Sequence, residues 1–252
     1  MKNSTIKILL LLIAFIGFNT YAGYSQSEKR FYSSTSLEMI FSFADIDVDS
    51  VNASTVLRWA PVLNIQFIYN FDMNKNLGFF TGIDMRNLGF IWKNDKGEKW
   101  KHRVYTLGLP VGIKLGNLKS GMFVYAGYQI EYAFNYKEKY FLNGSKKTKD
   151  VYWFTNRVNV WQSSVLLGLN FPGGANLKFK YYLTDLLDNE YEEFNEDGVK
   201  VKPYAAFNKS QIFYFSLSFN MFHRDYEYFH NNLTGDTVRA SRRSVKNNKN
   251  WY

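Results

Sequence analysis

The chain has 252 residues, a length that suits one domain, and carries a formal net charge of +9 at pH 7. It contains no cysteine, which excludes disulfide bonds and a lipidated N-terminal cysteine. Aromatic residues make up 19% of the chain, with 19 Tyr and 23 Phe. That share is high for a soluble domain and typical of chains whose rings lie at membrane interfaces.

The N-terminus has the features of a secretory signal peptide. Lys2 and Lys7 supply a basic start, and residues 8–18 form an apolar run that is short for a membrane-spanning helix. Cleavage after Ala22 and cleavage after Ser25 both fit, and an uncleaved anchor is the alternative. We therefore expect residues 1–25 to be a signal peptide.

Removal of residues 1–25 takes away two lysines and no acid, so the formal charge falls from +9 to +7. A basic surplus can indicate nucleic-acid binding. Export argues against nucleic acid, and anionic lipid phosphates, including those of lipopolysaccharide, are the nearer partner.

The segment 211–222 shows the pattern that organises the rest of the chain. One set of alternate positions is apolar, and the other holds Tyr214, Ser216, Ser218 and Asn220. A strand sends successive side chains to opposite faces. The apolar face points inward in a soluble sandwich or lipocalin-like barrel and outward to lipid in a membrane barrel.

Seven earlier segments alternate in the same way, so eight strands are expected within a barrel domain of residues 26–222. Pro110 has no N–H to donate to the hydrogen-bond ladder of a regular central strand, so we expect a bulge there. The connections near Asp72, Asn117 and Pro172 are short, which predicts periplasmic turns; the others are long, which predicts extracellular loops. The expected strands are residues 37–44, 57–71, 77–92, 105–116, 122–135, 158–171, 176–184 and 211–222, and the long loops lie near Asp49, Asp95, Lys147 and Glu193.

Tryptophans cluster where the expected strands meet the long loops. An aromatic girdle at one membrane interface accounts for that clustering. It also favours lipid outside over the soluble, inverted arrangement. The expected girdle consists of Trp59, Trp92, Trp100, Trp153 and Trp161.

The expected inward faces carry charges of both signs. An eight-stranded barrel has an interior just wide enough to be filled by side chains, and unpaired buried charge is costly. We expect a salt-bridged polar network that fills the lumen; a ligand site or a narrow pore is the alternative. The expected network is Glu38, Asp84, Arg86, Lys114, Glu131, Lys178 and Lys180.

The last thirty residues, 223–252, lack alternation and become basic toward the end. An even strand count places both termini on the short-turn side. We expect a flexible basic periplasmic tail, which can bind a protein partner.

The signal peptide, the eight alternating strands and the segment Leu109-Pro110-Val111 resemble the outer-membrane β-barrel domain of Bacteroidota-type proteins, the PorT-like group. The resemblance covers about residues 37–222. It implies an outer-membrane location and insertion by the barrel-assembly machinery, and no specific activity. The chain departs from many outer-membrane proteins in continuing past Phe222, so the insertion signal is either 215–222 or Trp251-Tyr252.

No residue set has the spacing of a metal or cofactor site, and none is expected. Of the three histidines, only His102 falls on an expected barrel strand, with Ser163 near the same rim. A His with a nearby nucleophile is what a lipid-modifying enzyme would need. The absence of a surrounding motif favours a non-enzymatic protein, either a structural anchor or adhesin, or a component of a surface or export complex. A small lipid-modifying enzyme remains the alternative.

Overall fold

The computed structural model describes residues 29–49, 51–195 and 198–229. The expected signal peptide and residues 230–252 of the expected tail lie outside these ranges. Residues 29–228 form one compact unit, and the description below concerns that unit. Within the described ranges, no helix is long and apolar enough to cross a membrane.

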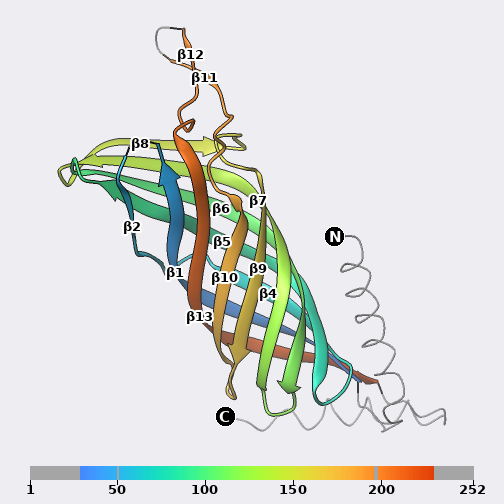
Figure 1. Ribbon diagram of the computed structural model, residues 1–252. Helices are drawn as coiled ribbons and strands as arrows, with labels where there is room; N and C mark the ends of the chain where they lie inside the picture. Colours follow the sequence, from blue (N-terminus) through green and yellow to red (C-terminus); the bar gives the residue numbers. More distant parts are fainter. Residues whose placement is uncertain (1–28, 50, 196–197, 230–252) are drawn as a thin grey trace, which may run out of the picture. The chain divides into compact units, whose positions relative to one another are not determined.

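Eight long strands close into a ring, which confirms the predicted antiparallel barrel. The order around the ring is β1-β4-β5-β6-β7-β9-β10-β13, and β13 pairs back with β1 (Figure 1). The strands are β1 (Lys29–Val48), β2 (Ala53–Val56), β3 (Arg58–Ala60), β4 (Ile65–Asp72), β5 (Leu77–Asn94), β6 (Glu98–Asn117), β7 (Met122–Leu142), β8 (Ser145–Trp153), β9 (Trp161–Asn170), β10 (Ala175–Asp185), β11 (Glu193–Phe194), β12 (Lys200–Val201) and β13 (Phe207–Phe229).

The two faces of the barrel wall follow the alternation of the sequence. On β6, Leu107, Leu109 and Val111 point outward, and Leu109 is 62% exposed. Lys114 and Pro110 lie on the buried, inward side of the same strand. The apolar set therefore covers the outside of the barrel and the polar set fills the inside.

Three strands run well beyond the barrel and form a sheet that projects from its long-loop end (Figure 1). We call this the sheet extension: residues 87–94 of β5, 98–105 of β6, 135–142 of β7 and all of β8. The expected loop near Lys147 is instead a hairpin that turns at Asn143 and Gly144, where φ is 48° and 82°. The sequence does not predict this hairpin, because lysines occupy one set of its alternate positions. In the barrel strands the corresponding outward positions are apolar.

The expected second strand, 57–71, is interrupted. β2 pairs with β5, β3 pairs with β1, and β4 pairs with both. Leu63 has a φ of 64°, so the chain leaves the strand conformation before β4. The buried Asn64 side chain holds the break, donating to the carbonyls of Glu38 (3.1 Å) and Ala60 (2.7 Å) and accepting from the N–H of Asn87 (2.8 Å).

The expected bulge at Pro110 is wrong. Pro110 pairs with Gln129 in regular register, and the bulge between β6 and β7 lies at Tyr105 and Thr106. The missing N–H is accommodated on the other side, where the β5–β6 ladder passes from Thr81–Val111 to Asp84–Gly108 without pairs between them. The gap leaves the pairing register of β5 and β6 unchanged. Pro110 therefore costs the barrel a few ladder hydrogen bonds and no shift in strand pairing.

The last strand also differs from the expectation. β13 continues to Phe229, so residues 223–229, assigned from the sequence to a flexible tail, are part of a strand. The backbone can extend a ladder where the side chains no longer alternate, because the ladder bonds are made by main-chain groups.

Replacing Asn64 by alanine should destabilise the barrel by about 1–3 kcal/mol, because it leaves the buried Asn87 N–H without its acceptor. Urea unfolding of the purified, folded protein measures the change. Asn208→Ala is the matched control, since Asn208 bonds only to exposed aspartates in the described chain. An Asn64→Ala midpoint equal to that control would contradict the role given to Asn64.

Candidate functional site

The interior of the barrel has three successive layers. A cavity lies at the short-turn end, an ionic network occupies the middle, and a hydrophobic cluster fills the long-loop end. Each layer is built from the inward positions of the ring strands. What the barrel can bind or pass is decided by these layers together.

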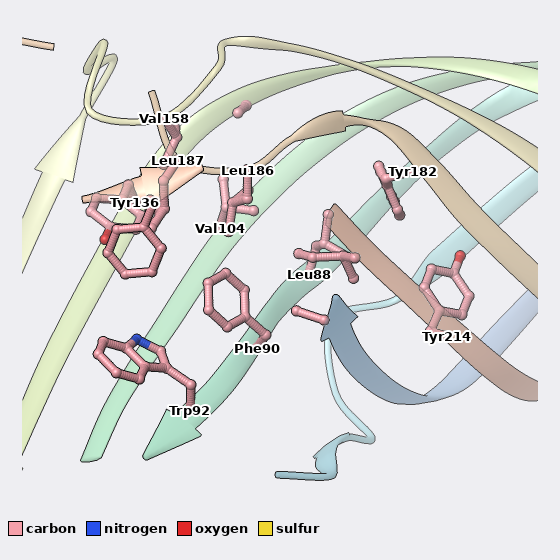
Figure 2. Close-up of a cluster of buried hydrophobic side chains, with 14 of the residues drawn as sticks. Leu88, Phe90, Trp92, Val104, Tyr136, Val158, Tyr182, Leu186, Leu187 and Tyr214 are labelled. Carbon is pink, nitrogen blue, oxygen red and sulfur yellow. The ribbon is translucent and has the colours of Figure 1, made fainter. Parts of the chain in front are cut away.

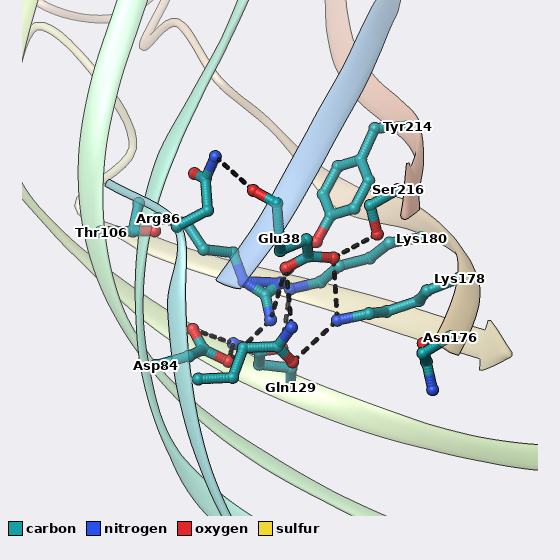
Figure 3. Close-up of polar contacts among 12 residues, drawn as sticks. Glu38, Asp84, Arg86, Thr106, Gln129, Asn176, Lys178, Lys180, Tyr214 and Ser216 are labelled. Atoms are coloured by element: carbon teal, nitrogen blue, oxygen red, sulfur yellow. Dashed lines mark hydrogen bonds and ion pairs between the residues drawn. The ribbon is translucent and has the colours of Figure 1, made fainter. Parts of the chain in front are cut away.

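Arg86 on β5 is the centre of the ionic network (Figure 3). Its guanidinium lies 2.9 Å from Asp84 and 3.5 Å from Glu38, and all three side chains are at most 1% exposed. It also donates to the hydroxyl of Tyr214 on β13, which lies across the lumen. One side chain thus ties three strands together from inside, as a planar guanidinium with several donors can.

Two lysines of β10 complete the network. Lys178 bonds to Glu38 (3.0 Å) and Gln66 (2.9 Å), and Lys180 pairs with Glu131 and bonds to Gln129 (2.8 Å). The network thus contains three carboxylates and three cations: Glu38, Asp84 and Glu131 with Arg86, Lys178 and Lys180. Its formal charge is zero, and each buried ion lies beside a partner of opposite sign, as the cost of an unpaired buried charge requires.

Lys114, the remaining residue of the expected network, is held separately. Its ammonium lies 2.5 Å from Asp72, 3.0 Å from Asn70 and 3.0 Å from the hydroxyl of Tyr32. The sequence predicts a turn at Asp72, and the expected network does not include it. It is the last residue of β4, and continuing the alternation from Asn70 by two positions would have found it.

The cavity beside Lys114 has a volume of about 370 Å³. Polar side chains of several strands line it, and it reaches the short turns at residues 118–121 and 173–174. Arg86 and Lys178 form its inner end. Among the described residues, the Nε atom of Arg86 is the one buried side-chain polar atom with no hydrogen-bond partner.

The hydrophobic cluster closes the lumen at the long-loop end (Figure 2). Leu88 and Phe90 of β5 pack there with Val104 of β6 and Tyr136 of β7. Leu186 and Leu187, which follow β10, enter from the connection above. Among the described residues, these side chains fill the lumen on the long-loop side of the ionic network.

The expected tryptophan girdle divides into two groups. Trp59, Trp153 and Trp161 are 62%, 63% and 64% exposed on the outside of the barrel. Trp92 is only 5% exposed and stacks on Trp100 with ring centroids 4.2 Å apart. Both rings pack with the hydrophobic cluster, so their assignment to an outer girdle is wrong. The reason is alternation: Trp92 lies two residues from Phe90 and shares its inward face.

His102 points into the hydrophobic cluster and is 1% exposed. Its Nδ1 lies 2.7 Å from the Tyr136 hydroxyl, and its Nε2 accepts from the indole N–H of Trp92 (3.1 Å). Burial lowers the pKa of His102 to about 4, so the ring is neutral at pH 7. The enzymatic alternative would require His102 to lie beside Ser163 or at a lipid-facing surface. Its ring instead bonds to Tyr136 and Trp92.

The part of the chain that the structure describes holds no group of three or more His, Asp or Glu side chains placed to bind a metal ion. The buried carboxylates of the network are instead engaged by cations and hydroxyls. Thr106 donates to Glu131 (2.6 Å), and so does Tyr182 (2.8 Å).

Replacing Arg86 by methionine should cost about 3–5 kcal/mol of unfolding free energy, because Asp84 loses its cation while it remains buried. Equilibrium urea unfolding measures the loss. Lys200→Met removes an exposed ion pair with Glu192 and should change stability little. Similar effects for the two variants would mean that the buried network does not hold the barrel together.

His102 should make stability fall at mildly acidic pH. Its folded pKa of about 4 lies below its ordinary value of 6.5, so the unfolded chain takes up the proton first as the pH falls. Its contribution is complete above pH 6.5 and is lost toward pH 4, a difference of about 3 kcal/mol at 1.36 kcal/mol per unit. The urea midpoint of His102→Gln should depend less on pH across that window than the wild-type midpoint. Parallel pH profiles would contradict this.

Comparisons with known proteins give structural neighbours only. No protein-family model matches the sequence, and no curated protein matches it. Ail, the attachment invasion locus protein of Yersinia pestis, solved with the heparin analogue sucrose octasulfate, is 11% identical with a TM-score of 0.34, over 77% of this chain and 99% of that one. Neisserial surface protein A is 11% identical with a TM-score of 0.32, over 76% and 97%. The outer membrane protein OprG of Pseudomonas aeruginosa is 12% identical with a TM-score of 0.31, over 82% and 98%.

Proposed function

We propose that this chain is an exported outer-membrane β-barrel of the PorT-like type, with a non-enzymatic anchoring role or a place in a surface or export complex. The observation that carries the proposal is the apolar outside of the barrel. Every one of the eight ring strands exposes at least one large apolar side chain, such as Leu37, Phe67, Ile83, Leu109, Ile130, Leu167, Leu183 and Phe219. A soluble protein does not expose a continuous belt of this kind.

The interior supports the same orientation toward lipid. A soluble lipocalin-like barrel encloses apolar side chains and exposes polar ones. Here the charged side chains of Glu38, Arg86 and Lys180 are buried in the lumen, and the leucines of β6 are outside. Turning the barrel inside out would expose these buried ion pairs to solvent.

Anchoring is supported more than transport. A pore needs a continuous polar path, and the cluster around Leu88 and Phe90 blocks it. In the orientation we propose, the short turns face the periplasm, and the sheet extension and the β11–β12 hairpin face outward. The long-loop end is then where protein partners would bind, since connections on a rigid scaffold carry recognition.

A washed outer-membrane fraction tests the proposal directly. An unboiled sample should run faster than a boiled one on a denaturing gel, because a folded membrane barrel resists detergent. The mass of the mature chain should show cleavage after Ala22 or Ser25. Recovery as a soluble periplasmic protein with no shift in mobility would contradict an outer-membrane barrel.

Bilayer recordings of the same purified protein test the absence of a pore. We expect no stepwise ion conductance, because the hydrophobic cluster closes the lumen. A heat-modifiable protein that conducts steadily would retain the membrane assignment and overturn the anchoring role.

A further inference from the structure

The outward face of the sheet extension carries a row of lysines in register across three strands. Lys101 of β6 pairs with Lys139 of β7, and Lys139 pairs with Lys149 of β8. Directly opposite residues in a sheet have Cβ atoms about 5 Å apart. The row therefore places three ammonium-bearing side chains side by side on one surface.

Neighbouring rows enlarge this surface. Arg103 lies opposite Lys137, and Phe141 lies between Lys99 and Lys146. We call the whole set the basic array: Lys99, Lys101, Arg103, Lys137, Lys139, Lys146 and Lys149. Apolar parts accompany the charges, since the Lys101 ammonium lies 4.9 Å from the centre of the Phe141 ring.

None of these seven cations forms a salt bridge in the described chain. Three exposed acids elsewhere at this end already have cationic partners. Glu190 pairs with Lys202, Glu192 with Lys200, and Asp45 with Lys209. Charge pairing is thus common at the long-loop end and missing at the basic array, which leaves the array available to an external anion.

The array repels itself in the absence of an anion. Burial, followed by the neighbouring cations Lys99, Lys139 and Arg103, lowers the pKa of Lys101. Lys137 and Lys139 have lowered pKa values for the same reasons. Like charges directly opposite one another destabilise a sheet. Such an arrangement is costly to the isolated protein and favourable to a bound polyanion.

The array sits immediately above the apolar belt on the same face. Along β6 the outward residues pass from Leu107 through Tyr105 to Arg103. Tyr105 lies beside Phe134 with ring centroids 6.3 Å apart, and Phe134 lies beside Trp153 at 6.2 Å. Apolar, aromatic and basic side chains in this order match the hydrocarbon, interfacial and headgroup regions of a lipid leaflet.

We propose that the basic array binds the phosphate groups of lipid A in the outer leaflet and so docks the sheet extension onto the membrane surface. This rests on the proposed outer-membrane location. Several lysines can share one phosphate as point charges, and a bilayer presents many phosphates in a plane. A soluble acidic polysaccharide could match the charge but would leave the adjoining aromatic row without a partner.

The test uses the full-length folded protein in phosphatidylcholine vesicles that contain either bisphosphorylated or dephosphorylated lipid A. Thermal loss of the fast-running unboiled band is followed as each lipid is titrated in. A ligand that binds the folded state raises the midpoint. Bisphosphorylated lipid A should raise it in wild type, and the dephosphorylated form should not.

The Lys137→Gln/Lys139→Gln variant should need roughly 25-fold more bisphosphorylated lipid A for the same shift, since each Lys near an anionic surface raises the affinity about fivefold. Without lipid A, the variant should be at least as stable as wild type, which a merely structural role would not produce. Lys75→Gln/Lys119→Gln removes the same charge at the opposite rim, where both residues are exposed, and should behave as wild type.

Equal shifts from both forms of lipid A, or equal titrations of wild type and the array variant, would overturn the inference. Stabilisation of wild type by inorganic phosphate alone would reassign the array to a small free anion. A soluble sulfated polysaccharide that acts where lipid A does not would also overturn it. In all these cases the protein would still run faster unboiled than boiled. Loss of that difference in mobility would instead count against the outer-membrane barrel itself.

Discussion

The guanidinium of Arg86 is the group on which the barrel interior depends. It bonds to Asp84 on its own strand and to Tyr214 across the lumen, and pairs with Glu38 on β1. Taking it from water is costly, and the cost is recovered only if its partners stay in place. Since β13 and β1 are the strands that close the ring, the same bonds that satisfy the ion also resist opening of the barrel.

Alternation made the barrel predictable from the sequence. Period-two patterning identifies the strands and their faces, so the eight-stranded ring and the inward placement of residues such as Glu38 and Lys180 could be derived without coordinates. Pairing partners could not, because register across the lumen is a three-dimensional property. The Arg86–Tyr214 contact shows this: 128 residues separate two side chains that meet.

Two of the errors lie in the sheet extension. Trp92 was grouped with the outer tryptophans by residue type, although its parity with Phe90 places it inside. The sequence predicts a loop where the β7–β8 hairpin lies, because lysines stand at its outward positions where the barrel strands have leucines. Strand formation depends on main-chain bonds and neighbouring strands, so a strand that runs beyond the barrel keeps its ladder and changes its outer residues.

The lumen of the barrel is hollow at one end and packed with side chains at the other. The space beside Lys114 reaches the short turns, and the packing around Leu88 and Phe90 seals the other end. In the outer-membrane anchoring role that we propose, a concentration gradient across the membrane would not be dissipated through this protein, however many copies the membrane contained.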